Sequence, residues 1–246
     1  MQGNLRGLKF GLQSYSLRKM SYEKAIEAIA DLGLSWVEAF PGHLPPEKKS
    51  ITEAQRLEQT YNVKVLAYGV NAMRRDEGQL RSLFEFAKGL GIEVLTADPE
   101  PDSFDLLDEL VREYRIKIAI HNHGPGHRYS RIANIVKALE GHDEMIGMCM
   151  DTAHLARSGE DILEATHRLG SRMHGLHIKD VNEDNNDTIV GEGRLPFGEL
   201  FQALRREKIL NSCALILEIE LEPDNPMPAV RKSVENVHSL LIRTIS

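Results

Sequence analysis

The sequence has few cysteines. Among its 246 residues only Cys149 and Cys213 occur, and each lies inside an apolar stretch. Buried free thiols are therefore expected, rather than a disulfide or a thiolate metal site. This favours a reducing, cytoplasmic location, an expectation that holds for a chain that has not lost an export signal.

Long apolar runs and basic blocks are also lacking. No run approaches the roughly 20 residues of a membrane span, and residues 1–7 lack the apolar centre of a signal peptide. The formal net charge is −7, without a stripe of Lys and Arg, so nucleic acid is not an expected partner. Hydrophobic residues make up 41% and charged residues 27%, the usual balance of a soluble globular protein.

The sequence does contain a regular alternation of short apolar runs and longer segments with helical periodicity. Eight runs are expected to form strands, each followed by one helix, and no linker interrupts them. The expected strands are 8–13, 36–39, 64–69, 93–97, 117–121, 147–151, 173–178 and 214–219. The expected helices are 21–32, 52–61, 77–90, 104–114, 130–139, 161–169, 197–206 and 229–242. One domain over residues 1–246 is therefore predicted.

Eight strand–helix units in a chain of this length favour an α/β fold of the closed (β/α)8, or TIM, barrel type. The alternative is a doubly wound open sheet, whose nucleotide-binding forms carry a glycine-rich turn after the first strand. Here that turn reads QSYSL at positions 13–17, without glycine. The barrel is the predicted fold, and functional side chains are expected at the C-terminal ends of its strands.

Side chains that bind metals stand at the ends of the last four expected strands. They are His121, Asp151, His177 and Glu218. Two imidazoles and two carboxylates suit one divalent ion such as Mn, Co, Zn or Fe better than calcium, because imidazole is not a hard ligand. Mg is kept as a further candidate for the ion. Asp151 has an alternative role as the cap of a following helix, and Glu220 can share the role of Glu218, because residues two apart on a strand point the same way. The remaining histidines are expected to be structural or solvated: His43, His127, His142, His167, His174 and His238.

At these residues the chain resembles the xylose isomerase-like barrel superfamily of sugar isomerases, ketose epimerases, inosose dehydratases and related metal-dependent endonucleases. The likeness rests on HNHGP at 121–125, GMCMDTAH at 147–154, LHIKDV at 176–181, GEGRLPF at 191–197 and LEIE at 217–220. It implies one divalent ion, with Asp151, His177 and Glu218 matching ligands and His154 matching a substrate-contacting histidine. At strand five, the epimerases carry Glu where this chain has His121, and His123 is the alternative ligand there.

The resemblance implies a metal-dependent sugar isomerase or epimerase that removes a proton next to a carbonyl. Glu218 is the expected base, and His154 or Lys179 is expected to relay protons on oxygen. A lyase or dehydratase acting on a ketosugar or inosose begins with the same step and remains open. A non-catalytic sugar-binding barrel and an endonuclease IV-like repair enzyme are further alternatives, the last disfavoured because it needs three zinc ions and a basic face.

The substrate is expected to be a small, sugar-like molecule. Six residues are expected to contact it: Gln13, Tyr15, Glu38, Asn122, His123 and Arg157. No glycine-rich loop or Arg cluster follows the last strands, which favours a substrate without phosphate. A homo-oligomer is compatible with the sequence.

Overall fold

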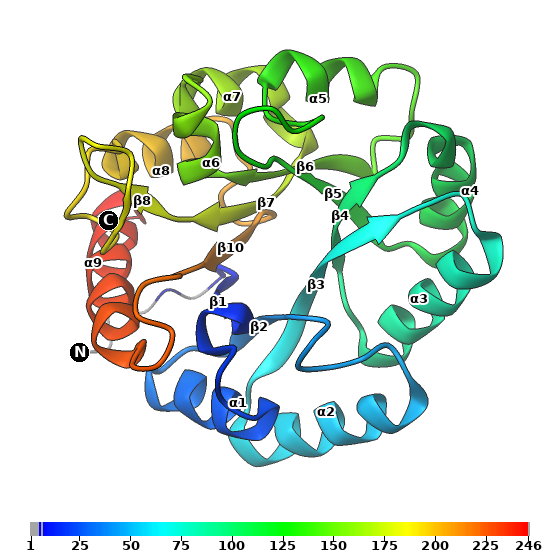
Figure 1. Cartoon of the computed structure of the whole chain (residues 1–246), viewed down its shortest axis with the longest axis horizontal. Coiled ribbons are helices and arrows are strands. Elements are labelled where there is room, and N and C mark those ends of the chain that lie inside the picture. The colour runs from blue at the N-terminus through cyan, green and yellow to red at the C-terminus, as the bar shows by residue number, and fades with distance from the viewer. Residues whose placement is uncertain (1–4, 6, 246) are drawn as a thin grey trace.

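A computed structural model of the chain describes residues 5 and 7–245. Its strands form a closed parallel barrel in the order β1-β10-β7-β6-β5-β4-β3-β2, with helices around the outside (Figure 1). The predicted (β/α)8 barrel is confirmed. Residues 1–4, 6 and 246 of the expected domain lie outside the described residues. They include most of residues 1–7, where no signal peptide is expected. No helix in the described part of the chain combines the length and apolarity needed to cross a membrane.

All eight expected strands are present. The largest shift is in the third, which runs to residue 73 instead of 69. The barrel strands are β1 (Phe10–Gln13), β2 (Trp36–Ala39), β3 (Lys64–Met73), β4 (Val94–Pro99), β5 (Lys117–His121), β6 (Ile146–Asp151), β7 (Met173–Ile178) and β10 (Ala214–Leu217).

The eight expected helices are also present, and α6 and some short elements are additional. The helices are α1 (Tyr22–Asp31), α2 (Lys48–Tyr61), α3 (Glu77–Leu90), α4 (Phe104–Tyr114), α5 (Ile132–Leu139), α6 (Thr152–Arg157), α7 (Ile162–Leu169), α8 (Phe197–Arg206) and α9 (Met227–Ile245), with 3-10 turns η1 (Ser14–Leu17), η2 (Pro101–Ser103) and η3 (Gly170–Arg172). The expectation of one helix after each strand is wrong at β6, which is followed by both α6 and α7. Gly159, with φ of 73°, lies in the turn between them.

Residues that flank the helices explain where they begin and end. Ser21, Asp76 and Asp161 precede α1, α3 and α7, and the side chain of each accepts a hydrogen bond from a backbone N–H of the first turn. Gly91 ends α3 in the left-handed conformation, with φ of 67°. Local chemistry therefore sets these boundaries without help from distant residues.

A two-stranded antiparallel hairpin, β8 (Asp180–Val181) and β9 (Asp187–Thr188), follows β7 and was not expected. The carboxylate of Asp180 accepts hydrogen bonds from the backbone N–H groups of Gly191, Gly193 and Leu195 at 2.9, 3.0 and 3.2 Å. A Cβ atom at position 193 would lie 2.3 Å from Asp180 Oδ1, so this close approach requires glycine. The GEGRLPF segment is thereby fastened to the end of β7.

The barrel interior has an apolar floor. A small cluster separate from the main core contains Leu66, Ala67, Val94, Ala119, Cys149, Ala214 and Ile216. Residues two apart on a strand point the same way, so His121, Asp151 and Glu218 stand directly above Ala119, Cys149 and Ile216. Both cysteines are buried and free, as predicted. Polar groups at the mouth therefore rest on a layer that excludes water from below.

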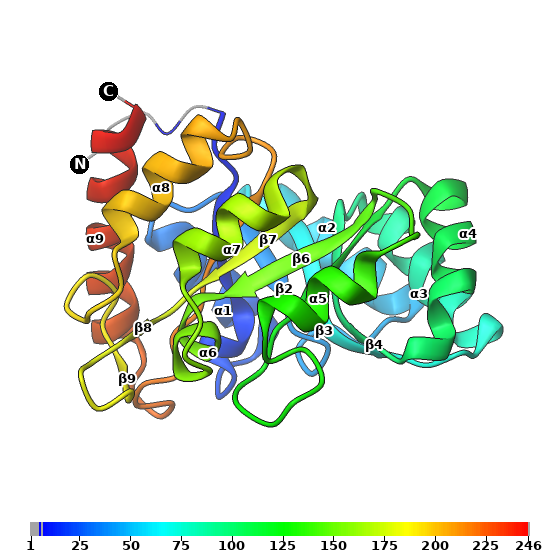
Figure 2. The same ribbon diagram turned by 90° about the horizontal axis from the view of Figure 1, so that it is seen from above.

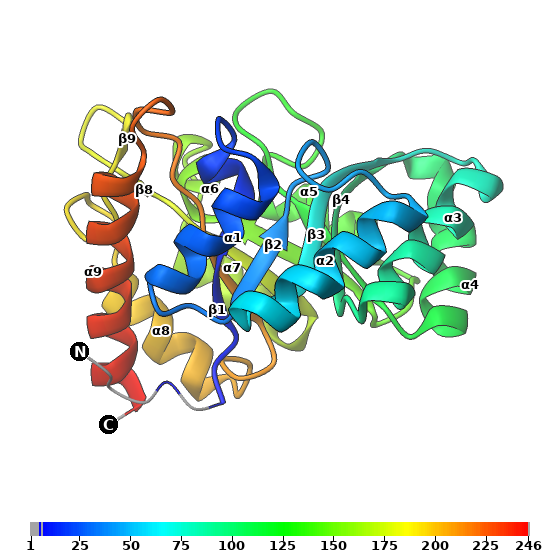
Figure 3. The same cartoon turned by 90° about the horizontal axis from the view of Figure 1, so that it is seen from below.

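Loops that follow the strands project from one end of the barrel. Figure 3 shows the β8–β9 hairpin and the loop between β5 and α5 at the same end, while α9 finishes at the opposite one. The view from the other side shows the same loop and hairpin beyond the barrel (Figure 2). The C-terminal ends of the strands thus open into a mouth bordered by these loops.

Candidate metal centre

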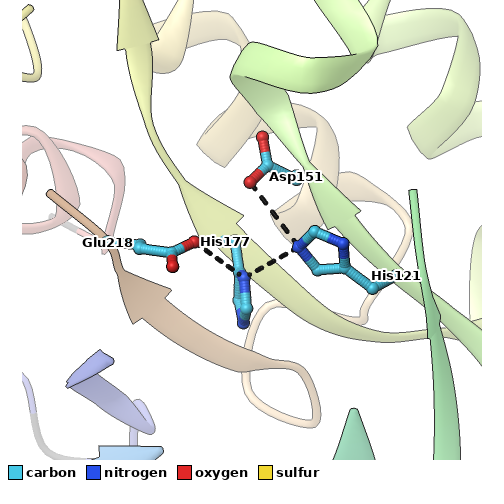
Figure 4. A group of neighbouring side chains, drawn as sticks. All are labelled: His121, Asp151, His177 and Glu218. Atoms are coloured by element: carbon cyan, nitrogen blue, oxygen red, sulfur yellow. Dashed lines mark hydrogen bonds and ion pairs between the residues drawn. The ribbon is translucent and has the colours of Figure 1, made fainter. Parts of the chain in front are cut away.

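Four side chains from neighbouring strands meet at this mouth (Figure 4). His121, Asp151, His177 and Glu218 each bring one possible ligand atom, and these atoms lie within 4.8 Å of one another. His177 Nδ1 lies 3.1 Å from His121 Nε2 and 3.1 Å from Glu218 Oε2. His121 Nε2 lies 3.6 Å from Asp151 Oδ2. The structure therefore brings together the four residues that the sequence predicts as ligands.

The two carboxylate oxygens of Asp151 have different surroundings. Oδ1 accepts a hydrogen bond of 2.8 Å from the backbone N–H of His154 and so caps α6. Oδ2 is buried and has no hydrogen-bond partner in the described part of the chain. The charges nearest to Oδ2 are Lys179 Nζ at 3.7 Å and His121 Nε2 at 3.6 Å, beyond hydrogen-bond distance, so a cation bound directly to Oδ2 would stabilise this buried carboxylate further. The cap and the ligand roles are thus compatible.

The donor atoms fit a divalent metal ion in type and in spacing. Ligands bound at about 2.0–2.2 Å in a tetrahedral arrangement lie about 3.3–3.6 Å apart, close to the 3.1–3.6 Å separations seen here. Two imidazole nitrogens with two carboxylate oxygens suit an ion of intermediate hardness. His121, Asp151, His177 and Glu218 would hold it.

Glu38 lies behind His177 and not at an open surface of the pocket. Its Oε2 is 3.0 Å from Nε2 of His177, and neither residue is more than 1% exposed. When Nε2 carries the proton and donates it to Glu38, the lone pair of Nδ1 is free to bind an ion. The structure thus places Glu38, which was expected to contact substrate, against His177.

Lys179 lies beside the carboxylates of the cluster. Its Nζ is 3.7 Å from Asp151 Oδ2 and 3.7 Å from Glu218 Oε2, and it also contacts Glu220 Oε1. Burial alone would lower the pKa of this lysine, but attraction from these carboxylates outweighs burial and raises it. Burial alone would raise the pKa of Glu218, but Lys179 and His177 bring it down to about 2. Both groups are therefore charged at neutral pH.

Two further histidines extend the cluster. The ring of His121 lies 4.7 Å from that of His123 and 6.1 Å from that of His154, measured between centroids. Burial lowers the pKa of His154, and burial with the neighbouring imidazoles lowers the pKa of His123 to about 3. Both rings are neutral at neutral pH. Only His121 lies with the other three ligands, whereas His123 belongs to a second group with Asp98 and His127.

Gln13 and Tyr15, expected in the substrate pocket, are engaged by the protein itself. Gln13 is 2% exposed, donates to the carbonyl of Gly69 at 3.2 Å and accepts from the backbone N–H of Tyr15 at 3.1 Å. The Tyr15 ring packs edge-on against Phe40, and the guanidinium of Arg18 lies 4.5 Å from its centroid. Gln13 therefore shapes the turn after β1, and Tyr15 keeps partial exposure.

Asn122 and Arg157 also have protein partners. The side-chain amide of Asn122 accepts from the backbone N–H of Asp151 at 2.7 Å and donates to its carbonyl at 2.9 Å. Arg157 donates to the carbonyl of Asn185 and to the carboxylate of Asp187, and so connects α6 to the β8–β9 hairpin. Asn122 thus supports a predicted ligand directly, and Arg157 supports the rim of the mouth.

Sequence reasoning did not single out Asp98 and His127 as a pair. The structure brings a donor atom of each within 4.8 Å of one from His123. The His-x-x-x-His spacing at 123 and 127, directly after a strand, is the signal that points to this group. His127 had been expected to be structural or solvated.

Comparison with known proteins agrees with this architecture. An inosose dehydratase of Mesomycoplasma hyopneumoniae (strain 7448) is 26% identical over 151 residues, covering 53% of this chain and 50% of the relative. One from Bacillus cereus (strain AH820) is 33% identical over 101 residues, covering 41% and 33%. The chain thus spans about half or less of the length of these relatives.

Solved structures share the fold. The 3-keto-D-glucoside 4-epimerase YcjR from E. coli matches with a TM-score of 0.78 and 16% identity, over 94% of this chain and 99% of that one. The IOLI protein, solved with a zinc atom, matches with a TM-score of 0.73 and 17% identity, over 97% and 98%. The family model described as "Xylose isomerase-like TIM barrel" matches residues 26–240, and the chain belongs to this family.

Proposed function

We propose that this chain is a divalent-metal-dependent enzyme that removes a proton from the carbon next to a carbonyl group of a small, sugar-like substrate. The observation that carries this proposal is the four-ligand cluster at the barrel mouth, with Lys179 beside two of its carboxylates. The names of the relatives, an inosose dehydratase and a 3-keto-D-glucoside 4-epimerase, support a polyhydroxylated carbonyl compound as substrate.

Glu218 is the group that we assign as the base. Bound at this cluster, a divalent ion would polarise the carbonyl and make the neighbouring C–H more acidic. Of the four ligand side chains, that of Glu218 is 11% exposed, whereas the others are 4% exposed or less. It is unprotonated at neutral pH, because its pKa is about 2. Glu218 is therefore open to the mouth and in the unprotonated form that a base requires.

His154 and Lys179 are assigned to the oxygen atoms of the substrate. His154 Nδ1 is buried without a hydrogen-bond partner among the described residues, and burial lowers the pKa of the ring. A neutral imidazole can give or take a proton on a hydroxyl group. Lys179 stays protonated, because the carboxylates around it raise its pKa, and it can stabilise negative charge on oxygen.

Isomerisation or epimerisation is the first candidate outcome, and elimination of water is the second. The ketose epimerases that this chain resembles use a second glutamate at strand five, where His121 stands here. Elimination requires one base and one acid, and Glu218 as the base with the protonated Lys179, or His154, as the donor to the leaving hydroxyl provides that pair. His121 and the dehydratase names of the relatives favour this second candidate.

Location, substrate charge and domain number are also part of this proposal. The protein is proposed to work in the cytoplasm, on a substrate without phosphate, as one domain. Its net charge of −7 favours a sugar-like substrate over DNA. Specific incision of abasic duplex DNA would overturn this choice of substrate.

The test is proton exchange with solvent. Metal-loaded protein is incubated in D2O with a panel of ketoses, inososes and 3-keto-glucosides, and NMR follows the carbons next to the carbonyl. Deuterium at one of these carbons supports the proposal. A new diastereomer or aldose would identify an epimerase or isomerase, and a dehydrated product would identify a lyase. Binding without exchange for any substrate would favour a non-catalytic sugar-binding barrel and overturn the proposal.

A further inference from the structure

A second group of metal-binding side chains lies beside the first and takes no part in the proposed function. Asp98 comes from the end of β4, and His123 and His127 come from the loop after β5. One donor atom from each lies within 4.8 Å of the others. Nε2 of His127 is 3.4 Å from Oδ2 of Asp98, and the ring centroids of His123 and His127 are 4.3 Å apart.

The loop that carries the histidines is fastened to the strand that carries the aspartate. Arg128 donates to the carbonyl of Pro99 at 2.9 Å and pairs with the carboxylate of Glu100 at 2.6 Å. The hydroxyl of Tyr129 donates to the same carbonyl of Pro99 at 2.7 Å. These contacts join the residues directly after His127 to those directly after Asp98. The two ligand side chains are therefore held opposite each other before any ion binds.

The turn itself directs His127 back toward the strand. Gly126 has φ of 87°, a conformation that favours glycine, and the backbone N–H of His127 donates to the carbonyl of Gly124 at 3.2 Å. Oδ1 of Asp98 and Nδ1 of His127 are buried and have no hydrogen-bond partner within the described ranges. The pair thus keeps unused donor and acceptor capacity that its own contact does not satisfy.

We propose that Asp98, His123 and His127 form a second metal site, suited to Zn²⁺, next to the four-ligand cluster. Zinc ligands bound at about 2.0–2.1 Å lie about 3.3 Å apart in tetrahedral geometry, close to the 3.4 Å between His127 and Asp98. Two imidazoles select zinc over magnesium or calcium. Three protein ligands leave a fourth position for water or an incoming oxygen.

The two sites are adjacent but differ in their exposure to solvent. The ring of His123 lies 4.7 Å from that of His121, which belongs to the first site. The side chains of Asp98 and His127 are 28% and 36% exposed, whereas the first site is buried. The second ion should therefore exchange faster with a chelator than the first.

The experiment measures zinc per chain. Protein stripped with a chelator is reloaded with ZnCl2, desalted and measured by elemental analysis, with circular dichroism as a check on folding. Wild-type protein is expected to hold two equivalents, and Asp98→Asn and His127→Ala are each expected to hold one. The matched control is His167→Ala, which removes a histidine that is 83% exposed and 3.3 Å from Glu207. This control should keep two equivalents.

A variant of the first site separates the two proposals. Asp151→Asn should also hold one equivalent, and the Asp151→Asn, His127→Ala double variant should hold none. If Asp98→Asn and His127→Ala keep the full wild-type complement, the second site is wrong. If they lose one equivalent while Asp151→Asn loses none, the second site stands and the first, on which the proposed function depends, falls.

Discussion

The carboxylate of Glu38 and the Nε2 atom of His177 lie 3.0 Å apart, although the two residues are 139 positions apart in the sequence. The other nitrogen of the ring, Nδ1, faces His121 and Glu218. A carboxylate behind a ligating histidine fixes its tautomer and orientation, and raises its basicity. We therefore expect Glu38 to decide which nitrogen His177 presents to an ion.

Removing this carboxylate should weaken metal binding without changing the ligand set. Glu38→Ala is expected to lower the affinity of the first site about 10–100-fold, as loss of such a partner typically does. Chelator competition on reloaded protein measures the change. Glu38→Gln retains an acceptor for Nε2–H and should lose less affinity than Glu38→Ala. Equal affinity in wild type and Glu38→Ala would show that Glu38 does not act through His177.

Asp151 provides a way to separate metal binding from helix capping. Asp151→Asn keeps an oxygen that can cap α6 but removes the negative charge, so it should fold and lose the ion of the first site. Asp151→Ala should lose the ion and also about 1 kcal/mol of stability relative to Asp151→Asn, because the cap is gone. Metal analysis gives the metal content of each variant. Urea unfolding of the chelator-treated proteins gives the free energy of unfolding. A full metal complement in both variants would exclude Asp151 as a ligand.

The base assignment rests on Glu218 rather than Glu220. Glu218→Gln should remain folded and reduce deuterium exchange at the carbon next to the carbonyl by at least 10²–10⁴-fold, the usual contribution of a positioned base. NMR in D2O measures the rate once a substrate from the panel is identified.

Glu220→Gln is the matched control for this experiment. Glu220 is 32% exposed and pairs with Lys179, whereas Glu218 lies 3.1 Å from His177. Glu220→Gln should therefore keep most of the exchange rate. Loss of exchange in Glu220→Gln with a normal rate in Glu218→Gln would reverse the assignment.

His174 is not one of the predicted ligands. Its titration should make the free energy of unfolding depend on pH. His174 is 3% exposed, its Nε2 bonds the carbonyl of Glu144 at 2.9 Å, and burial together with Lys117 lowers its pKa to about 4. The unfolded chain takes up this proton below about pH 6.5, but the folded chain does so only near pH 4. Stability is therefore lost as the pH falls from 6.5 toward 4, by about 2 kcal/mol at pH 5.

Urea unfolding at pH 7 and pH 5 tests this expectation. Glutamine cannot titrate, and its amide can still donate toward Glu144, so His174→Gln is the suitable comparison. Wild type should lose about 2 kcal/mol more than His174→Gln between the two pH values. The same pH dependence in both proteins would mean that His174 is not the group responsible.

Much of the barrel could be predicted because its signals are local. The bounds of α3, α4, α8 and β5 follow from periodicity and flanking residues alone. The end of β3 could not be predicted, because residues 71–73 become strand only through pairing with Ala97, Asp98 and Pro99 of β4. The β8–β9 hairpin was missed because two-residue strands have no measurable period. Its turn depends on Asn182, whose side chain accepts from two backbone N–H groups.

Some contacts of the candidate site could likewise be predicted from the sequence, and others could not. Strand ends in a barrel point to one mouth, so the grouping of His121, Asp151, His177 and Glu218 follows from the fold class. The contact between Glu38 and His177 spans the inside of the barrel, and no local pattern encodes it. The position of His127 over Asp98 depends on how a loop folds back, which turn residues alone do not define.

Asn122 completes the last rung of the β5–β6 ladder with its side chain, since it bonds both the N–H and the C=O of Asp151. Aspartate has no amide donor for this double contact, and glutamine is one methylene too long. One side chain thus closes the ladder at the position of the ligands. Any redesign of the loop after β5 therefore has to keep Asn122, because this amide holds the backbone of Asp151.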